Sequence, residues 1–171
     1  MEEDNRKKIL YLHGLDSTLS KEKRVVMRLY LDVVAPKIDY RNTPGLFKEL
    51  SKLIAIEKPV AIVGSSMGGC LAYYLAMKHK LPALCFNPAL CCCPIEIDLP
   101  KLVKSNNHTV FVIGGKDNVV PAVENFEWIR LNANSNFELR WYNKMAHRVD
   151  VKIFKKEVER FLKRVLLRII R

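Results

Sequence analysis

Short apolar runs alternate along this chain with stretches whose apolar residues recur every three or four positions. Short continuous apolar runs are typical of strands buried in a parallel sheet, and here they cover residues 9–13, 33–38, 60–65, 83–87, 109–114 and 137–142. The periodic stretches predict helices over residues 19–31, 43–57, 70–80 and 121–132, with a last helix after Asp150. Strands that alternate with helices predict an α/β fold, in which helices cover both faces of a parallel sheet.

Three of the predicted helices carry a start signal. Thr43 and Pro44 predict that the second helix begins with threonine as its N-cap and proline in its first turn. Pro121 predicts the start of the fourth helix in the same way, and Asp150 is expected to cap the last one.

Polar residues follow five of the predicted strands at their carboxyl ends. They are His13, Ser66, Asn87, Asp117 and His147. Ligands of open parallel sheets bind beyond this edge, so we expect the functional site there.

Residues 64–68 read G-S-S-M-G and lie between a predicted strand and a predicted helix. In this context the pattern is typical of a nucleophile elbow, a tight turn that exposes its central residue above the sheet. Small residues at both ends avoid clashes in such a turn. Small residues also occupy ordinary strand-to-helix turns, so the pattern alone leaves that alternative open. We predict that Ser66, rather than its neighbour Ser65, is a nucleophile.

A serine hydroxyl needs a base to take its proton, and histidine is the usual choice. The chain has four histidines. His13 is expected to shape the loop after the first strand, His79 to cap a helix, and His108 to precede a strand at the wrong end of the sheet. His147 lies in a short loop at the carboxyl edge, and we predict that it is the base.

The base in turn needs a carboxylate to orient it, and Asp117 is the best-placed candidate. It follows an apolar strand and two glycines, although glycine with aspartate is also an ordinary turn signal. Asp98 lies in an irregular segment, and Asp150 is explained as a cap. The order Ser66, Asp117, His147 is the chain order of the triad in α/β-hydrolases.

An oxyanion hole needs two backbone N–H groups aimed at the developing negative charge. One is expected from Met67, which follows the candidate nucleophile. The other is expected from Leu15, in the loop after the first strand.

Composition is typical of one globular domain over residues 1–171, with 49% hydrophobic and 27% charged residues. The formal net charge is +11, and more than half of it falls on the last twenty residues, where eight Lys and Arg stand against two Glu. Val151, Phe154, Val158, Val165 and Ile169 give this tail an apolar helical face. We expect a terminal helix with a solvated basic face, while contact with a membrane surface or a polyanion is the alternative. No nucleic-acid partner is expected.

The charged N-terminus predicts no signal peptide, and no apolar stretch is long enough to span a bilayer, so a cytoplasmic location is expected. The five cysteines include three adjacent ones, Cys91, Cys92 and Cys93. This arrangement does not predict a disulfide framework, and the absence of a C-x-x-C pair disfavours structural zinc. Cys70 and Cys85 are expected to pack in the core, and the triple cysteine to pack as small hydrophobes.

Five segments together resemble the α/β-hydrolase superfamily and, more narrowly, the small bacterial esterases of the YqiA-like group. They read ILYLHGL at 9–15, GSSMGG at 64–69, FNPA at 86–89, GKD at 115–117 and AH at 146–147. The resemblance implies a compact sheet of strand order 2-1-3-4-5-6, a triad of Ser66, Asp117 and His147, and hydrolysis of esters or thioesters. We expect this reaction to need no metal and no cofactor.

The candidate residues of the substrate pocket come from the segment after the fourth strand and from loops near the predicted triad. Residues 88–108 are the only insertion at lid position, which predicts an open cleft bordered by the segment from Leu90 to Cys93, with Leu90 and Cys91 as candidates for its wall. Val119 is a further candidate, and Arg148 either attracts an anionic substrate group or faces solvent. Two other functions stay open: a non-catalytic binding protein that uses its basic tail, and a peptidase or amidase with the same triad.

Overall fold

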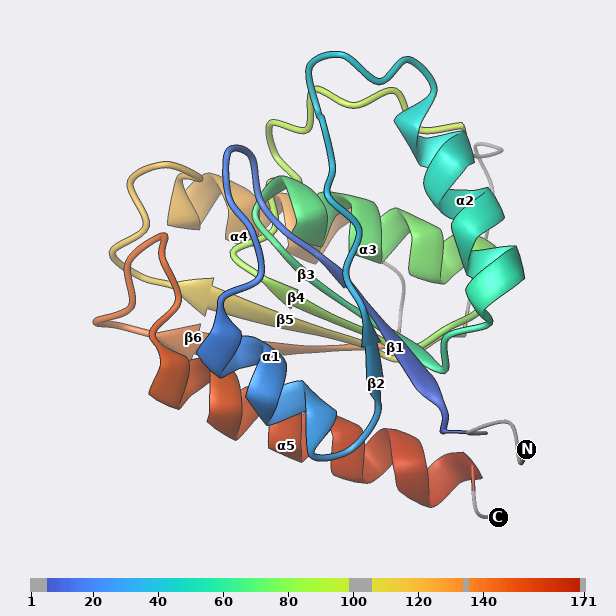
Figure 1. Ribbon diagram of the computed structural model, residues 1–171. Helices are drawn as coiled ribbons and strands as arrows, with labels where there is room; N and C mark the ends of the chain where they lie inside the picture. The colour runs from blue at the N-terminus through green and yellow to red at the C-terminus, as the bar shows by residue number, and fades with distance from the viewer. Residues whose placement is uncertain (1–5, 99–105, 134–135, 170–171) are drawn as a thin grey trace, which may run out of the picture.

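The computed structural model describes residues 6–98, 106–133 and 136–169, and its centre is a six-stranded parallel sheet (Figure 1). The strands are β1 (Lys8–Leu12), β2 (Asp32–Val34), β3 (Ala61–Ser65), β4 (Ala83–Phe86), β5 (Thr109–Gly114) and β6 (Phe137–Tyr142). Their order is β2-β1-β3-β4-β5-β6, and every neighbouring pair is parallel. The predicted α/β class and strand order are confirmed.

Helices cover both faces of this sheet, as the continuous apolar strands predicted. They are α1 (Lys21–Arg28), α2 (Leu46–Glu57), α3 (Met67–His79), α4 (Ala122–Asn132) and α5 (Val151–Ile169). Figure 1 shows α1 and α5 on one face and α2, α3 and α4 on the other. Successive residues of a strand point to opposite faces, so Ile62 packs into the core beneath α2 and α3 while Val63 packs beneath α1 and α5.

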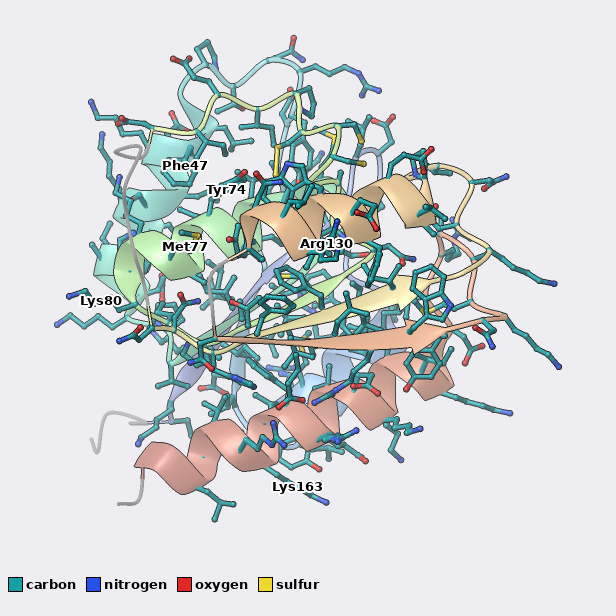
Figure 2. The ribbon with its side chains drawn as sticks, turned by 180° about the vertical axis from the view of Figure 1, so that it is seen from behind. Phe47, Tyr74, Met77, Lys80, Arg130 and Lys163 are labelled. Carbon is teal, nitrogen blue, oxygen red and sulfur yellow. A yellow bond between two sulfur atoms is a disulfide. The ribbon has the colours of Figure 1, made fainter. Side chains whose placement is uncertain are left out.

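The basic tail forms α5, which packs its apolar face on the sheet. Its buried apolar side chains are Phe154, Val158, Phe161, Leu162 and Val165. Its outer face carries lysines such as Lys163, which points away from the sheet in Figure 2. Among the described residues, no helix is both long enough and apolar enough to cross a membrane.

Three helix starts differ from the sequence-based expectation, and one of them is that of α3, which begins at Met67 rather than at residue 70. Helix α2 begins at Leu46, after Gly45, rather than at Pro44. Gly45 adopts a left-handed conformation with φ +69° and has no side chain to cap the helix, so Thr43 and Pro44 belong to the preceding loop. Helix α1 is shorter than its apolar pattern, because Ser20 caps it by accepting a hydrogen bond from the Lys23 amide. The cap at Asp150 is confirmed, since its carboxylate accepts a hydrogen bond from the Lys152 amide.

The expectation that Cys70 and Cys93 are free thiols is wrong. A disulfide joins Cys70 in α3 to Cys93 in the segment after β4. The two residues are 23 positions apart, and only the turn after β4 brings them together, so their spacing in the sequence gave no sign of the bond. Cys85 is buried as expected, Cys91 is half-buried and Cys92 is exposed.

Candidate active site

Ser66 stands in the strained turn between β3 and α3. Its backbone has φ +56° and ψ −122°, a left-handed region that side chains rarely adopt. The flanking glycines are required by close packing. A Cβ on Gly64 would lie 2.1 Å from the carbonyl oxygen of Gly68, and one on Gly68 would lie 2.1 Å from the carbonyl oxygen of Leu12. The G-x-S-x-G spacing therefore lets the helix start directly against two strands, with the serine above the sheet.

A cleft of about 1100 Å³ opens at the carboxyl edge of the sheet, above Ser66. Its walls include residues from the loops after β1, β5 and β6. These loops lie toward the left of Figure 1. The chain's candidate residues on its wall are Leu15, Ser66, Met67, Val119, His147 and Arg148. The fold therefore brings residues more than a hundred positions apart to one surface.

Asp117 and His147 are joined by a hydrogen bond of 2.8 Å between Oδ2 and Nδ1. The other carboxylate oxygen of Asp117 accepts hydrogen bonds of 2.9 Å from the amides of Val119 and Val120. The Asp117 side chain is 1% exposed and that of His147 is 26% exposed. A carboxylate only accepts, so Nδ1 carries the proton and the imidazole keeps Nε2 free to take another.

The hydroxyl of Ser66 and the imidazole of His147 share the cleft without a direct hydrogen bond between them in the described part of the chain. Hydrogen bonds between a nucleophile and its base are often long without substrate and tighten in the complex. The arrangement supplies a hydroxyl, a base and a fixed carboxylate at one surface.

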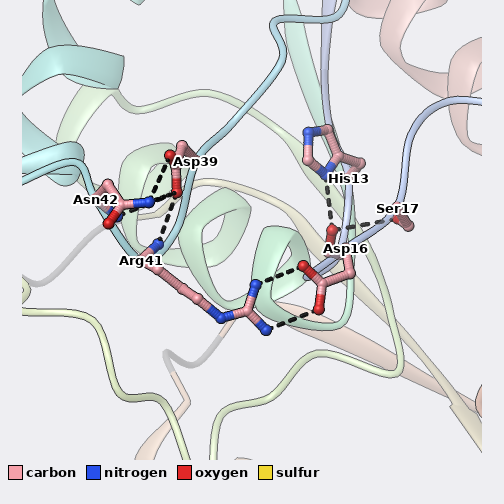
Figure 3. A network of polar contacts seen from close by, with 7 residues as sticks. His13, Asp16, Ser17, Asp39, Arg41 and Asn42 are labelled. Carbon is pink, nitrogen blue, oxygen red and sulfur yellow. Dashed lines mark hydrogen bonds and ion pairs between the residues drawn. The ribbon is translucent and has the colours of Figure 1, made fainter.

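The peptide between Gly14 and Leu15 is held in one orientation. The Gly14 carbonyl accepts hydrogen bonds from His13 Nδ1 at 2.7 Å and from the Ser17 hydroxyl at 3.2 Å (Figure 3). His13 Nε2 accepts a hydrogen bond from the Ile38 amide, so Nδ1 is the protonated nitrogen. In a planar trans peptide the N–H points opposite to the C=O, which turns the Leu15 amide away from this network.

A second contact holds the same loop from outside. Arg41, in the loop after β2, forms a bidentate ion pair of 2.5 and 2.7 Å with Asp16 (Figure 3). The Tyr40 hydroxyl donates to the carbonyl of His13. A Cβ on Gly14 would lie 3.2 Å from the Cβ of Ser66, so this loop packs directly against the elbow. In the described part of the chain, neither the Leu15 amide nor the Met67 amide donates a hydrogen bond, so both remain available to a ligand.

Asn87 supports the loop that carries His147, a structural role that sequence reasoning did not assign to it. Its buried side chain donates hydrogen bonds of 3.0 Å to the carbonyls of Ala146 and His147, and accepts one of 2.7 Å from the Gly114 amide. It therefore ties the His147 loop to the ends of β4 and β5. The available signal was a polar amide directly after a fully apolar strand.

Replacing Asn87 by alanine should lower the free energy of unfolding by about 2 to 3 kcal/mol, because buried carbonyl and amide groups lose their partners. Urea denaturation measures this change. Asn132→Ala, which removes an exposed hydrogen bond to the Trp128 carbonyl, is the matched control and should cost less than about 1 kcal/mol. Equal losses in both variants would contradict the role of Asn87.

The pocket candidates fall into two groups. Val119 and Arg148 line the cleft. Leu90 does not, because its side chain is buried in the core on the α3 side of the sheet. Cys91 is also absent from the wall, which instead includes its neighbour Cys92. The proposed lid segment falls partly outside the described residues, at 99–105.

A smaller cavity of about 410 Å³ adjoins the cleft. The two share Leu15, Met67 and Pro94, so the cavity begins beside the two free amides. Its other walls include Tyr40, Pro44, Leu46 and Ile95. Arg41 and Glu96 add two charged side chains to this lining, and its apolar part suits a hydrocarbon chain.

The model of an uncharacterised protein family, UPF0227, matches residues 8–111. Solved structures of low sequence identity share the fold. Maize (Zea mays) acyl-protein thioesterase 2 has a TM-score of 0.65 and 16% identity, with 97% of this chain and 95% of that chain covered. Est1E from Butyrivibrio proteoclasticus has a TM-score of 0.72 and 10% identity, with 97% and 90% covered.

A third structure carries the name of the superfamily. It is MGS-MChE2, an α/β hydrolase enzyme from the metagenome of sediments of the Mar Chica lagoon in Morocco, with a TM-score of 0.70 and 15% identity over 95% of this chain and 92% of that chain. The chain therefore has the α/β-hydrolase fold. At these identities the likeness speaks for the fold alone.

Proposed function

We propose that this chain, which belongs to the uncharacterised protein family UPF0227, is a serine hydrolase of acyl esters or acyl thioesters. One observation carries the proposal. The hydroxyl of Ser66, at a strained elbow, shares a cleft with an imidazole whose Nδ1 is fixed by Asp117 at 2.8 Å. The fold of α/β hydrolases and the free amides of Leu15 and Met67 support the same reaction class.

The first half of the reaction acylates Ser66. Nε2 of His147 takes the hydroxyl proton as Oγ attacks the acyl carbonyl, and the carbonyl oxygen gains a negative charge. The amides of Leu15 and Met67 hold this oxyanion. Asp117 stabilises the imidazolium without taking its proton. The imidazolium then protonates the leaving alcohol or thiol, and an acyl-serine ester remains.

The second half releases the acid. His147 removes a proton from a water molecule, which attacks the acyl-serine carbonyl and forms a second oxyanion at the same two amides. Collapse of that intermediate breaks the bond to Oγ, which regains its proton from His147. The enzyme ends as it began, and the ester has become an acid and an alcohol.

A panel of substrates with one acyl group and three leaving groups tests this function. We expect turnover of the oxygen ester and the thioester, with the matched amide slower, because an amine leaves less readily than an alkoxide or thiolate. An amide cleaved faster than the ester would favour the peptidase alternative. No turnover of any member, together with salt-sensitive binding to lipid or nucleic acid, would favour the non-catalytic alternative.

The cavity beside Leu15 and Met67 predicts which acyl chains are preferred. Each buried methylene contributes about 0.8 kcal/mol, so kcat/KM should rise roughly fourfold per methylene until the cavity is full. Ile95→Trp narrows the cavity and should remove this rise while sparing acetyl esters. Ile56→Trp, at an exposed position of α2 outside the cavity lining, is the control. If kcat/KM still rises with acyl-chain length in Ile95→Trp as it does in the wild type, the acyl chain does not bind in this cavity.

A further inference from the structure

Two cationic side chains line the cleft on the side where α1 and α5 begin. Lys23 comes from the first turn of α1, and Arg148 comes from the loop before α5. The Lys23 ammonium is half-buried and lies 5.2 Å from the centroid of the Phe154 ring. Neither of them lines the cavity beside Leu15 and Met67. Arg41 does line that cavity, but its guanidinium is already paired with Asp16.

Lys23 and Arg148 have no carboxylate partner within ion-pair distance in the described part of the chain. They lie close enough to affect each other. Burial lowers the pKa of Lys23, the charge of Arg148 lowers it further, and Asp150 opposes this with a weaker effect. The charge of Arg148 therefore contributes a positive potential at Lys23.

Each carboxylate of the same cleft accepts hydrogen bonds, although Asp16 alone among them pairs with a cation of the described residues. Asp16 is held by Arg41, and Asp150 accepts a hydrogen bond of 2.7 Å from the Lys152 amide. Hydrogen bonding to its own backbone amide, and then to the Ser20 side chain, lowers the pKa of Glu22. The side chains of Lys23 and Arg148 therefore have N–H donors without an ion-pair partner, while each carboxylate near them already accepts a hydrogen bond.

The helix ends add to this asymmetry. Helices α1 and α5 both begin at the cleft wall, and the N-terminus of a helix carries a partial positive charge. This charge reinforces two side chains that already stand within the cleft beside Ser66 and His147.

We propose that Lys23 and Arg148 form an anion subsite that binds a carboxylate or phosphate on the leaving group of the substrate. The inference rests on the proposed function, because it places the scissile carbonyl at Ser66. The acyl chain extends into the cavity beside Leu15 and Met67, and the leaving group therefore points toward α1 and α5. The substrate class becomes acyl esters or thioesters of an anionic alcohol or thiol.

Three aryl acetates test the subsite. They are 4-acetoxybenzoate, its neutral methyl ester, and 4-acetoxyphenyl phosphate. The quantity compared is the ratio of kcat/KM for each anionic ester to that for the neutral one. Comparing this ratio between wild type and variant cancels the different intrinsic reactivities of the esters.

Lys23→Gln and Arg148→Gln should each lower the ratio about tenfold, because each removes a charge-assisted hydrogen bond. The ratio in the wild type should also fall as salt is added. Lys163→Gln removes an equal charge from the outer face of α5 and should leave the ratio unchanged. A larger loss for the phosphate than for the benzoate would identify phosphate as the preferred anion, and the reverse would identify carboxylate.

An unchanged ratio in both cleft variants would overturn the subsite even if all three esters are hydrolysed. An equal fall of the ratio in Lys163→Gln would show that the net charge of the protein causes the effect, and this result would also overturn the subsite. NMR titration with 4-hydroxyphenyl phosphate separates the two proposals. Binding to the wild type that weakens in Lys23→Gln supports the subsite even without hydrolysis, whereas no binding to the wild type overturns it.

Discussion

Replacing Ser66 by alanine should lower kcat/KM for an ester substrate by about 10⁵- to 10⁶-fold, the loss seen when a triad nucleophile is removed. The change removes one oxygen and leaves the cleft intact. Alanine meets the same backbone strain at φ +56° as serine does, so the melting temperature should stay within a few degrees. Steady-state hydrolysis of a chromogenic ester and a thermal melt measure the two quantities.

Ser65→Ala is the matched control for this variant. Ser65 is the last residue of β3 and lines the same cleft one position earlier. It should retain activity within a few-fold of the wild type. If Ser65→Ala loses activity and Ser66→Ala keeps it, the nucleophile has been assigned to the wrong serine.

Asp117→Asn should lower kcat by about 10⁴-fold with little change in KM, as in the serine protease triad, where the same exchange has this effect. The asparagine oxygen can still accept from the amides of Val119 and Val120, so the turn survives. Its amide group, however, donates to Nδ1 of His147. The imidazole proton then moves to Nε2, and the nitrogen facing the cleft can no longer accept a proton.

Kinetics across pH and a urea melt separate this cause from unfolding. The variant should unfold at nearly the same urea concentration as the wild type. Asp16→Asn, at a carboxylate that pairs with Arg41 in the outer loop, should lose far less activity. An Asp117→Asn enzyme within tenfold of the wild type would exclude Asp117 as the orienting carboxylate.

Most strands of the sheet could be predicted from the apolar runs of the sequence. Residues 109–114 and 137–142 are strands with the predicted bounds, because each is one apolar or alternating run between turn residues. The short edge strand β2 was overestimated, at residues 33–38 against Asp32–Val34, because apolar residues continue past the end of its pairing with β1. The apolar pattern of one segment does not determine how many of its residues pair with the neighbouring strand.

The site was predictable where its residues follow strands and unpredictable where contacts join distant loops. Ser66, Asp117 and His147 were selected from the edge of the sheet. Ser66 and His147 do share one cleft, and the buried Asp117 is hydrogen-bonded to His147, while the roles of all three stay predictions. The Arg41–Asp16 pair depends on how two loops fold over each other. The burial of Leu90 depends on a turn after β4. No sequence spacing encodes such contacts.

Mass spectrometry after treatment with a fluorophosphonate probe tests the central claim most directly, because the probe needs an activated serine but no knowledge of the substrate. We predict a single covalent adduct on the wild-type chain, located at Ser66 by peptide mapping and absent from Ser66→Ala. Asp117→Asn should react much more slowly. An unlabelled wild type, or a Ser66→Ala chain labelled as fast as the wild type, would contradict the assignment of a serine hydrolase.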